Sequence, residues 1–235
     1  MKINHPGRNV IAIILVILFL LYPVAGFPMQ PAPKHSERHT VPKVGFSDVE
    51  KWTKVFEDPK RAAWQKPEEV IEKLVLKSGD SVADIGAGTG YFTRLFAQAV
   101  GPNGRALGLE VEQSMVNYMI EDARKLGLDN YEARRIGTDN PELGPGSVDV
   151  IFLCNTYHHI DNRVEYFRNV STSLKSGGRV VVVDFYKKAL PEGPPPDHKI
   201  SQQLVSSEFE EAGYVLIRSH DFLPYQYFLE FGVRQ

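Results

Sequence analysis

Short β-rich segments alternate with amphipathic helical segments along most of the chain, and this alternation constrains the fold more than any other feature. From about residue 46 the hydrophobic period switches repeatedly between that of a helix and that of a strand. The predicted strands are 81–85, 105–109, 130–136, 148–154, 179–185, 214–219 and 225–233, and the predicted helices are 47–56, 67–76, 91–100, 114–126, 164–174 and 201–212. Strands joined by helices favour a parallel sheet covered on both faces. We therefore predict an α/β protein with a doubly wound, mostly parallel, seven-stranded sheet.

The last two predicted strands differ from the others because no helix lies between them. Only a short loop that contains Pro224 joins them. A connection of this length joins neighbouring antiparallel strands, whereas parallel strands need a long crossover. The sheet is therefore expected to end in an antiparallel C-terminal hairpin.

The N-terminal residues 1–26 form a separate element. Lys2 and Arg8 precede an unbroken apolar run at residues 10–22, and small residues follow it. This layout is typical of a secretory signal peptide. The run is short for a membrane span, which needs about 20 apolar residues, but its extension through residue 25 leaves an uncleaved signal anchor open.

Two consequences follow for the organisation of the chain. Residues 27–45 hold four prolines without apolar periodicity and are predicted to be a linker, so the folded domain covers residues 46–235. The domain is expected to be exported (periplasmic or secreted) or held at a membrane through residues 10–25. Basic residues lie on both sides of the apolar run, so the side of the membrane stays open.

Charge and cysteine content exclude several classes of function. The chain has 27 Lys and Arg against 29 Asp and Glu, whereas nucleic-acid affinity comes mostly from clustered cations. No nucleic-acid partner is therefore expected. Cys154 is the only cysteine, which excludes an internal disulfide and a multi-cysteine metal site. No recognised metal-ligand spacing is present, and no metal is expected.

A glycine-rich turn, Asp84-Ile85-Gly86-Ala87-Gly88-Thr89-Gly90, connects the first predicted strand to a helix. Glycines at such a turn let the backbone approach a ligand closely. Glu110 ends the next strand, 20 residues after Gly90, where a carboxylate can accept hydrogen bonds from both ribose hydroxyls. The pattern predicts a nucleoside site.

The spacing of the glycines decides between nucleoside ligands. A dinucleotide fingerprint requires its third glycine at position 91, which is Tyr91, and no Lys-Ser/Thr pair follows the turn as in a P-loop. The turn instead resembles motif I of the class I S-adenosylmethionine-dependent methyltransferases, acid-x-G-x-G-x-G. The resemblance covers roughly residues 67–235 and extends to type 11-like methyltransferase domains. It implies a Rossmann-like methyltransferase fold, S-adenosylmethionine as cofactor and a small-molecule methyl acceptor.

The resemblance also implies roles for individual residues of the cofactor site. Asp84, Gly86 and Gly88 would lie along the methionine part of the cofactor, and Glu110 would hold the ribose. Either Thr138 or Asp139, after the third strand, would reach the adenine. The complete predicted cofactor set is Asp84, Gly86, Gly88, Gly90, Glu110, Thr138, Asp139 and Asn155.

The segment Asn155-Thr156-Tyr157-His158-His159 follows the fourth strand, at the edge of the sheet where ligands bind. The resemblance places it beside the transferred methyl group. A base is needed only if the acceptor must lose a proton, and His158 or His159 is the candidate, with Tyr157 orienting the acceptor. The alternative, in which one histidine packs and the other caps a helix, stays open.

Two further segments lie near the expected site. Residues 61–66 are interpreted either as a lid over the cofactor or as a packed entry turn, and His198 either lines the acceptor pocket or lies on a surface loop. Two other functions are kept as alternatives to methyl transfer: a nucleotide-dependent oxidoreductase, and a non-catalytic cofactor-binding module tethered at a membrane. The sequence does not indicate the acceptor's identity or the oligomeric state.

Overall fold

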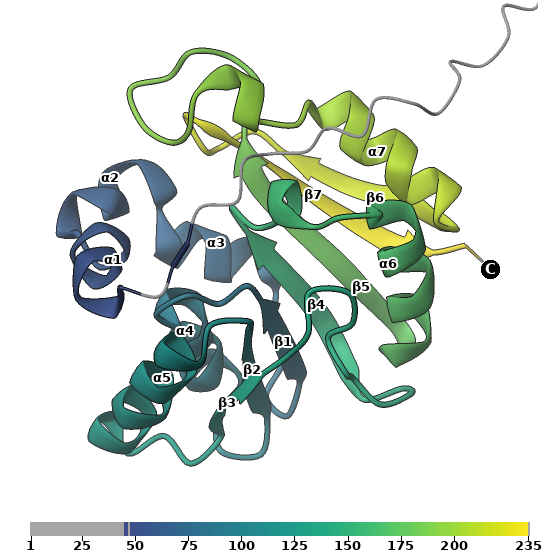
Figure 1. Cartoon of the computed structure of the whole chain (residues 1–235). Helices are drawn as coiled ribbons and strands as arrows, with labels where there is room; N and C mark the ends of the chain where they lie inside the picture. Colours follow the sequence, from purple (N-terminus) through teal and green to yellow (C-terminus); the bar gives the residue numbers. More distant parts are fainter. Residues whose placement is uncertain (1–44, 47, 235) are drawn as a thin grey trace, which may run out of the picture. The chain divides into compact units, whose positions relative to one another are not determined.

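A computed structural model describes residues 45–46 and 48–234 (Figure 1). Residues 1–26, the predicted signal or anchor, and almost all of the predicted linker lie outside these described residues. Within the described part of the chain, no helix combines the length and apolarity needed to cross a bilayer.

The seven strands form one sheet in the order β3-β2-β1-β4-β5-β7-β6. Their bounds are β1 Ser81–Ile85, β2 Arg105–Glu110, β3 Tyr131–Arg135, β4 Val148–Cys154, β5 Leu174–Phe185, β6 Tyr214–His220 and β7 Gln226–Val233. Strands β1 to β5 pair in parallel, and β7 pairs antiparallel with both β5 and β6. The predicted doubly wound, mostly parallel sheet with an antiparallel C-terminal hairpin is confirmed.

Helices cover both faces of the sheet. The α-helices are α1 Val49–Phe56, α2 Ala62–Gln65, α3 Pro67–Leu74, α4 Tyr91–Val100, α5 Gln113–Leu126, α6 Arg163–Val170 and α7 Gln202–Glu211. Four short 3-10 turns are η1 Pro59–Arg61, η2 Tyr157–His159, η3 Ser171–Ser173 and η4 Pro196–His198. Side chains of α3, α4 and α5 share one core cluster with one face of the sheet, and side chains of α6 and α7 share a second cluster with the other face.

Successive side chains of each strand point to opposite faces of the sheet, so one strand contributes to both clusters. In β1, Val82 belongs to the core under α3 to α5, whereas Ala83 and Ile85 belong to the core under α6 and α7. The central strands are therefore buried on both faces. Asp84 lies on the same face as Val82, which directs a carboxylate toward α4.

The structure corrects the boundary between α6 and β5. The sequence analysis placed a helix to residue 174 and a strand from 179, but α6 ends at Val170 and β5 begins at Leu174. The hydroxyls of Ser171 and Thr172 donate to carbonyls three residues earlier, and such local bonds compete with helix continuation. Leu174 then pairs with Val148 at the start of β4.

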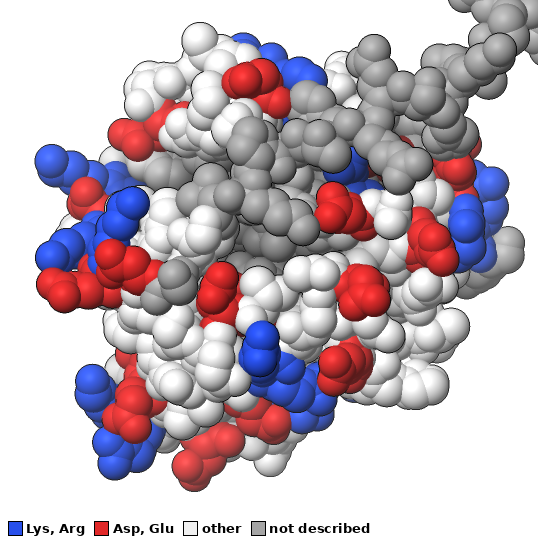
Figure 2. All heavy atoms as spheres, viewed as in Figure 1, with Lys and Arg blue, Asp and Glu red and all other residues white. Residues whose placement is uncertain are grey.

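Charges are mixed over the face drawn in Figure 2, where Lys and Arg stand among Asp and Glu. The described residues on this face therefore form no broad field of one sign. The parallel strands end at a common edge of the sheet, and the loops that follow β1, β2, β3, β4 and β5 meet there.

Candidate active site

Three positions in the turn between β1 and α4 require glycine. Gly86, Gly88 and Gly90 all have positive φ angles, of 69°, 57° and 78°. A Cβ atom on Gly86 would lie 2.3 Å from Cγ2 of Thr156, and one on Gly90 would lie 1.8 Å from the hydroxyl of Tyr131. The absence of side chains therefore lets the turn pack directly against the loop after β4 and against β3.

Asp84 is the second-last residue of β1 and is only 3% exposed. Thr93 of α4 donates its hydroxyl hydrogen to Oδ2 of Asp84, at 2.7 Å. Burial raises the pKa of Asp84 to about 7, an effect that the hydrogen bond from Thr93 reduces and the nearby charge of Glu110 increases. The Asp84 carboxyl group is thus close to half ionised at neutral pH.

Glu110, at the end of β2, is held directly against the glycine turn. Its Oε2 accepts a hydrogen bond from the amide of Gly88 at 2.9 Å, and its Oε1 accepts one from the amide of Val111 at 2.7 Å. Burial raises the pKa of Glu110, although these backbone bonds and one from Glu112 oppose the shift. Oε1 also accepts a bond from the amide of Glu112 at 3.2 Å. A carboxylate has about four acceptor positions, two on each oxygen, so the remaining capacity for the ribose lies on Oε2.

The N-terminal helix α1 is attached to the same turn. Glu57, which follows α1, accepts hydrogen bonds from Thr89 at 2.5 Å and from Arg94 at 2.8 Å. The ring of Phe56 lies 3.3 Å from the position of a Cβ on Gly88. The sequence analysis predicted this helix but not its partner, because an apolar stripe does not identify the surface on which it packs.

The loop after β4 brings His158 to a carboxylate of β5. Nδ1 of His158 lies 2.9 Å from Oδ2 of Asp184, and the two side chains are almost completely buried. Burial alone lowers the pKa of His158, but the charge of Asp184 and its hydrogen bond together outweigh burial and raise this pKa. Asp184 thereby holds the ring in one orientation, with Nε2 as the nitrogen that remains for chemistry.

His159 is exposed and lies beside His158, with ring centroids 4.1 Å apart. Its ring also meets Phe46 edge-on, at 5.7 Å. Partial loss of hydration and the neighbouring His158 lower the pKa of His159 to about 4. The neighbouring His198, half-buried at the end of η4, lowers the pKa of His159 further.

Tyr157 does not face the glycine turn. It is fully buried, and its hydroxyl donates to Oε2 of Glu208 in α7 at 2.6 Å. Its ring stacks on Phe167 and Phe209, with centroids 5.5 and 5.7 Å away. The prediction that Tyr157 orients the acceptor is therefore corrected. Its ring is packed in the core under α6 and α7, and its hydroxyl is bonded to Glu208.

The adenine candidates are not separated by the structure. Thr138 and Asp139 are both exposed in the loop that follows β3, and the negative charge of Asp139 contributes to the raised pKa of Tyr166. Their proposed contact with adenine stays a prediction.

Residues 61–66 pack as an entry element rather than as a free loop. Gln65 of α2 is fully buried and donates to Sγ of Cys154 at 3.1 Å and to Oε1 of Gln226 at 2.8 Å. Gln226 in turn donates to Oδ1 of Asn155 at 2.6 Å. Sequence analysis missed both glutamines, because no local pattern connects positions 161 residues apart.

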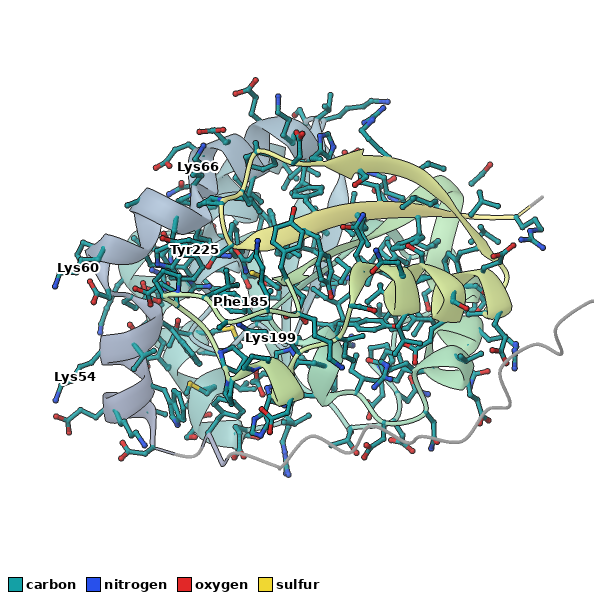
Figure 3. The ribbon with its side chains drawn as sticks, turned by 90° about the horizontal axis from the view of Figure 1, so that it is seen from above. Lys54, Lys60, Lys66, Phe185, Lys199 and Tyr225 are labelled. Carbon is teal, nitrogen blue, oxygen red and sulfur yellow. The ribbon has the colours of Figure 1, made fainter. Side chains whose placement is uncertain are left out.

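An aromatic group that includes Phe185 and Tyr225 borders this polar cluster (Figure 3). Trp64 of α2 lies 5.6 Å from the ring of Phe185, at the end of β5, and 6.2 Å from that of Tyr225. Nζ of the buried Lys199 lies 5.5 Å from the centre of the Phe185 ring and donates to the carbonyl of Lys188 at 2.9 Å. Burial lowers the pKa of Lys199, and the charge of Asp184 partly opposes this shift.

Comparisons with known proteins agree with this geometry. A family model described as a methyltransferase domain matches residues 76–221. The chain is 27% identical over 122 residues to the ubiquinone/menaquinone biosynthesis C-methyltransferase UbiE of Hahella chejuensis, which covers 52% of this chain and 49% of that protein. It is 30% identical over 123 residues to phosphoethanolamine N-methyltransferase 1 of Triticum aestivum, which covers 52% of this chain and 24% of that one. The chain therefore spans about half or less of the length of these curated relatives.

A solved structure covers more of the fold. The crystal structure of a SAM-dependent methyltransferase from Aquifex aeolicus superposes with a TM-score of 0.74 at 28% identity, and the match covers 80% of this chain and 98% of that one. The matched family model spans well over half of the 235 residues, including the glycine turn, Glu110 and the His158–Asp184 pair. This chain belongs to the methyltransferase domain family.

Proposed function

We propose that this protein catalyses the transfer of a methyl group from S-adenosylmethionine to a small-molecule acceptor. One observation carries this proposal: Oε2 of Glu110 accepts a hydrogen bond at 2.9 Å from the amide of Gly88, in the glycine-rich turn. The turn supplies a close backbone surface, and the carboxylate supplies an acceptor for a sugar. Family membership and the names of the relatives support the same reaction.

The residues of the turn fit this cofactor. The cofactor supplies an electrophilic methyl group on a sulfonium, and the protein mainly aligns donor and acceptor. Oε2 of Glu110 accepts a hydrogen bond from a ribose hydroxyl, and Asp84 faces the positively charged amino group of the methionine part. Thr138 or Asp139 contacts the adenine. Gly86, Gly88 and Gly90 keep the turn packed tightly against its neighbours, because side chains there would meet Thr156, Phe56 and Tyr131.

For an acceptor that must lose a proton, His158 is the base. Asp184 accepts the hydrogen on Nδ1, which leaves the lone pair of Nε2 to receive the acceptor's proton. The resulting positive charge is stabilised by the buried carboxylate 2.9 Å away. His159 is the alternative base, because its lowered pKa keeps its imidazole neutral at pH 7.

Calorimetric titration with S-adenosylmethionine and S-adenosylhomocysteine tests the cofactor. We expect both to bind, and lack of binding by the folded protein would contradict the proposal. A screen of small molecules with methyl-labelled S-adenosylmethionine then tests turnover. Methylated product would exclude the non-catalytic alternative, and tighter binding of NAD than of S-adenosylhomocysteine would favour an oxidoreductase.

We also propose that residues 1–26 direct the domain across a membrane or hold it there. The apolar run at 10–22, preceded by Lys2 and Arg8, supports this proposal. A reporter fused to the C-terminus of the full chain reports sidedness, and N-terminal sequencing of the mature protein reports cleavage. Equal reporter distribution with and without residues 1–26 would contradict a targeting role.

A further inference from the structure

Four side chains form one continuous series of hydrogen bonds from Arg61, the last residue of η1, to the loop after β4. Nε of Arg61 donates to Oε1 of Gln65 at 2.5 Å, and Nε2 of Gln65 donates to Oε1 of Gln226 at 2.8 Å. Nε2 of Gln226 then donates to Oδ1 of Asn155 at 2.6 Å. Gln65 and Gln226 are both fully buried, so neither can exchange these partners for water.

The arginine fixes the direction of the whole series. An amide side chain keeps its shape when its oxygen and nitrogen are exchanged, so its orientation is set by its partners. Arg61 can only donate, and its partner Gln65 must therefore present its oxygen to it. The nitrogen of Gln65 then faces Gln226, and the nitrogen of Gln226 faces Asn155. Reversal of any one amide would bring two donors or two acceptors together.

The series ends on a pair of free donors. Because Oδ1 of Asn155 receives the bond from Gln226, Nδ2 is the outward end of this amide, and no described residue accepts a hydrogen bond from it. Asn155 adopts a left-handed backbone conformation, with φ of 57°, directly after β4. The group that meets Asn155 at this edge must therefore carry lone pairs.

Aromatic rings accompany the series. Trp64 is adjacent to Gln65 and Tyr225 is adjacent to Gln226, and both aromatic side chains are only half-buried. Phe185 completes the group, with its ring 5.6 Å from that of Trp64, and Figure 3 shows Phe185 and Tyr225 close together. Such rings favour stacked or edge-on contact with a planar ligand.

We propose that Asn155, which the sequence analysis placed in the cofactor set, instead forms the acceptor subsite together with this aromatic group, and that the subsite takes a planar ring carrying an oxygen substituent. Nδ2 of Asn155 donates a hydrogen bond to that oxygen. Arg61, Gln65 and Gln226 are positioning residues, which keep the donor end of Asn155 directed outward. This inference rests on the proposed methyl transfer, because it assigns the molecule that receives the methyl group.

Two ring compounds of the same size test the predicted polarity. Benzyl alcohol has an oxygen with lone pairs, whereas benzylamine at pH 7 is an ammonium ion that can only donate. Both are titrated calorimetrically into the full-length protein loaded with S-adenosylhomocysteine. We expect the wild type to prefer benzyl alcohol by about tenfold, the scale of one hydrogen bond gained against an unpaired donor.

Asn155→Asp retains the shape of the side chain and its bond from Gln226, but replaces the outward donors with an acceptor. We expect it to invert the preference toward benzylamine. Gln226→Met breaks the series and lets the Asn155 amide turn, so the preference should fall to near unity. A purely structural role would weaken both ring compounds equally.

Asn117→Asp is the matched control, because Gln113 donates to Oδ1 of Asn117 at 2.9 Å in the same manner on the exposed surface of α5. It should leave the wild-type preference unchanged. An unaltered preference in both Asn155→Asp and Gln226→Met would overturn the inference, as would failure of both ring compounds to bind the loaded wild type. Failure of S-adenosylhomocysteine itself to bind would instead refute the proposed function.

Discussion

Cofactor binding should release a proton from Asp84. The buried carboxyl group has a pKa of about 7 in the free protein, whereas the methionine part of the cofactor carries an α-ammonium group. Contact with a cation favours the ionised carboxylate and lowers its pKa. A protein molecule whose Asp84 is protonated must therefore lose that proton when it binds the ligand.

The size of the effect follows from the pKa. If only the ionised form binds, protonation weakens the observed affinity by a factor of one plus the ratio of protonated to ionised Asp84. With a pKa of about 7, this factor is about 11 at pH 6, about 2 at pH 7 and about 1.1 at pH 8. Affinity should therefore rise about tenfold between pH 6 and pH 8, and about half a proton should be released at pH 7.

Calorimetry in buffers of different ionisation enthalpy measures both quantities with S-adenosylhomocysteine. Asp84→Asn should abolish the pH dependence and the proton release, and should bind more weakly than the wild type at pH 8. Thr93→Val removes the hydrogen bond that lowers the pKa of Asp84, so it should displace the pH dependence upward. Affinity that is constant from pH 6 to pH 8, or a pH dependence retained in Asp84→Asn, would refute the reasoning.

Three further predictions concern the base, the core and the turn. His158→Gln should lower kcat by about 10²- to 10⁴-fold, while calorimetry shows unchanged affinity for S-adenosylhomocysteine. A loss of affinity as large as the loss of kcat would contradict the role of His158 as base. Tyr157→Phe should lower the free energy of unfolding in urea by about 1 kcal/mol, because the bond to Glu208 is lost, and weaker ligand binding without lower stability would return Tyr157 to the site. Gly90→Ala should cost about 2–4 kcal/mol from positive φ and from the clash with Tyr131. Gly146→Ala, with positive φ in open space, is its control and should cost less; equal costs would contradict the packing argument.

Local patterns in the sequence predicted the sheet and the cofactor side of the site. The strand at 81–85, the glycine turn and Glu110 all depend on short-range rules: period-two burial, left-handed glycines and the common edge of parallel strands. These rules act within about 30 residues, and the structure brings Glu110 against Gly88 as they require. The roles assigned to individual residues from the family resemblance remain predictions.

The acceptor side depends on contacts that no local rule describes. Asp184 follows the run of valines in β5, and its sequence context indicates only one polar residue in a buried strand. The contact with His158 becomes apparent only in the folded structure. Gln65 and Gln226 meet across most of the chain. Tyr157 is adjacent to His158 in sequence, but its side chain enters the core under α6 and α7 while His158 bonds to Asp184, because neighbouring residues of a 3-10 turn face different directions.

A crystal structure with bound S-adenosylhomocysteine tests the central claim most directly. The account predicts the ligand at the carboxyl edge of β1 and β2, with a ribose hydroxyl within hydrogen-bond distance of Oε2 of Glu110 and the sulfur directed toward Asn155 and His158. Ligand bound elsewhere, or ribose hydroxyls without a contact to Glu110, would contradict it.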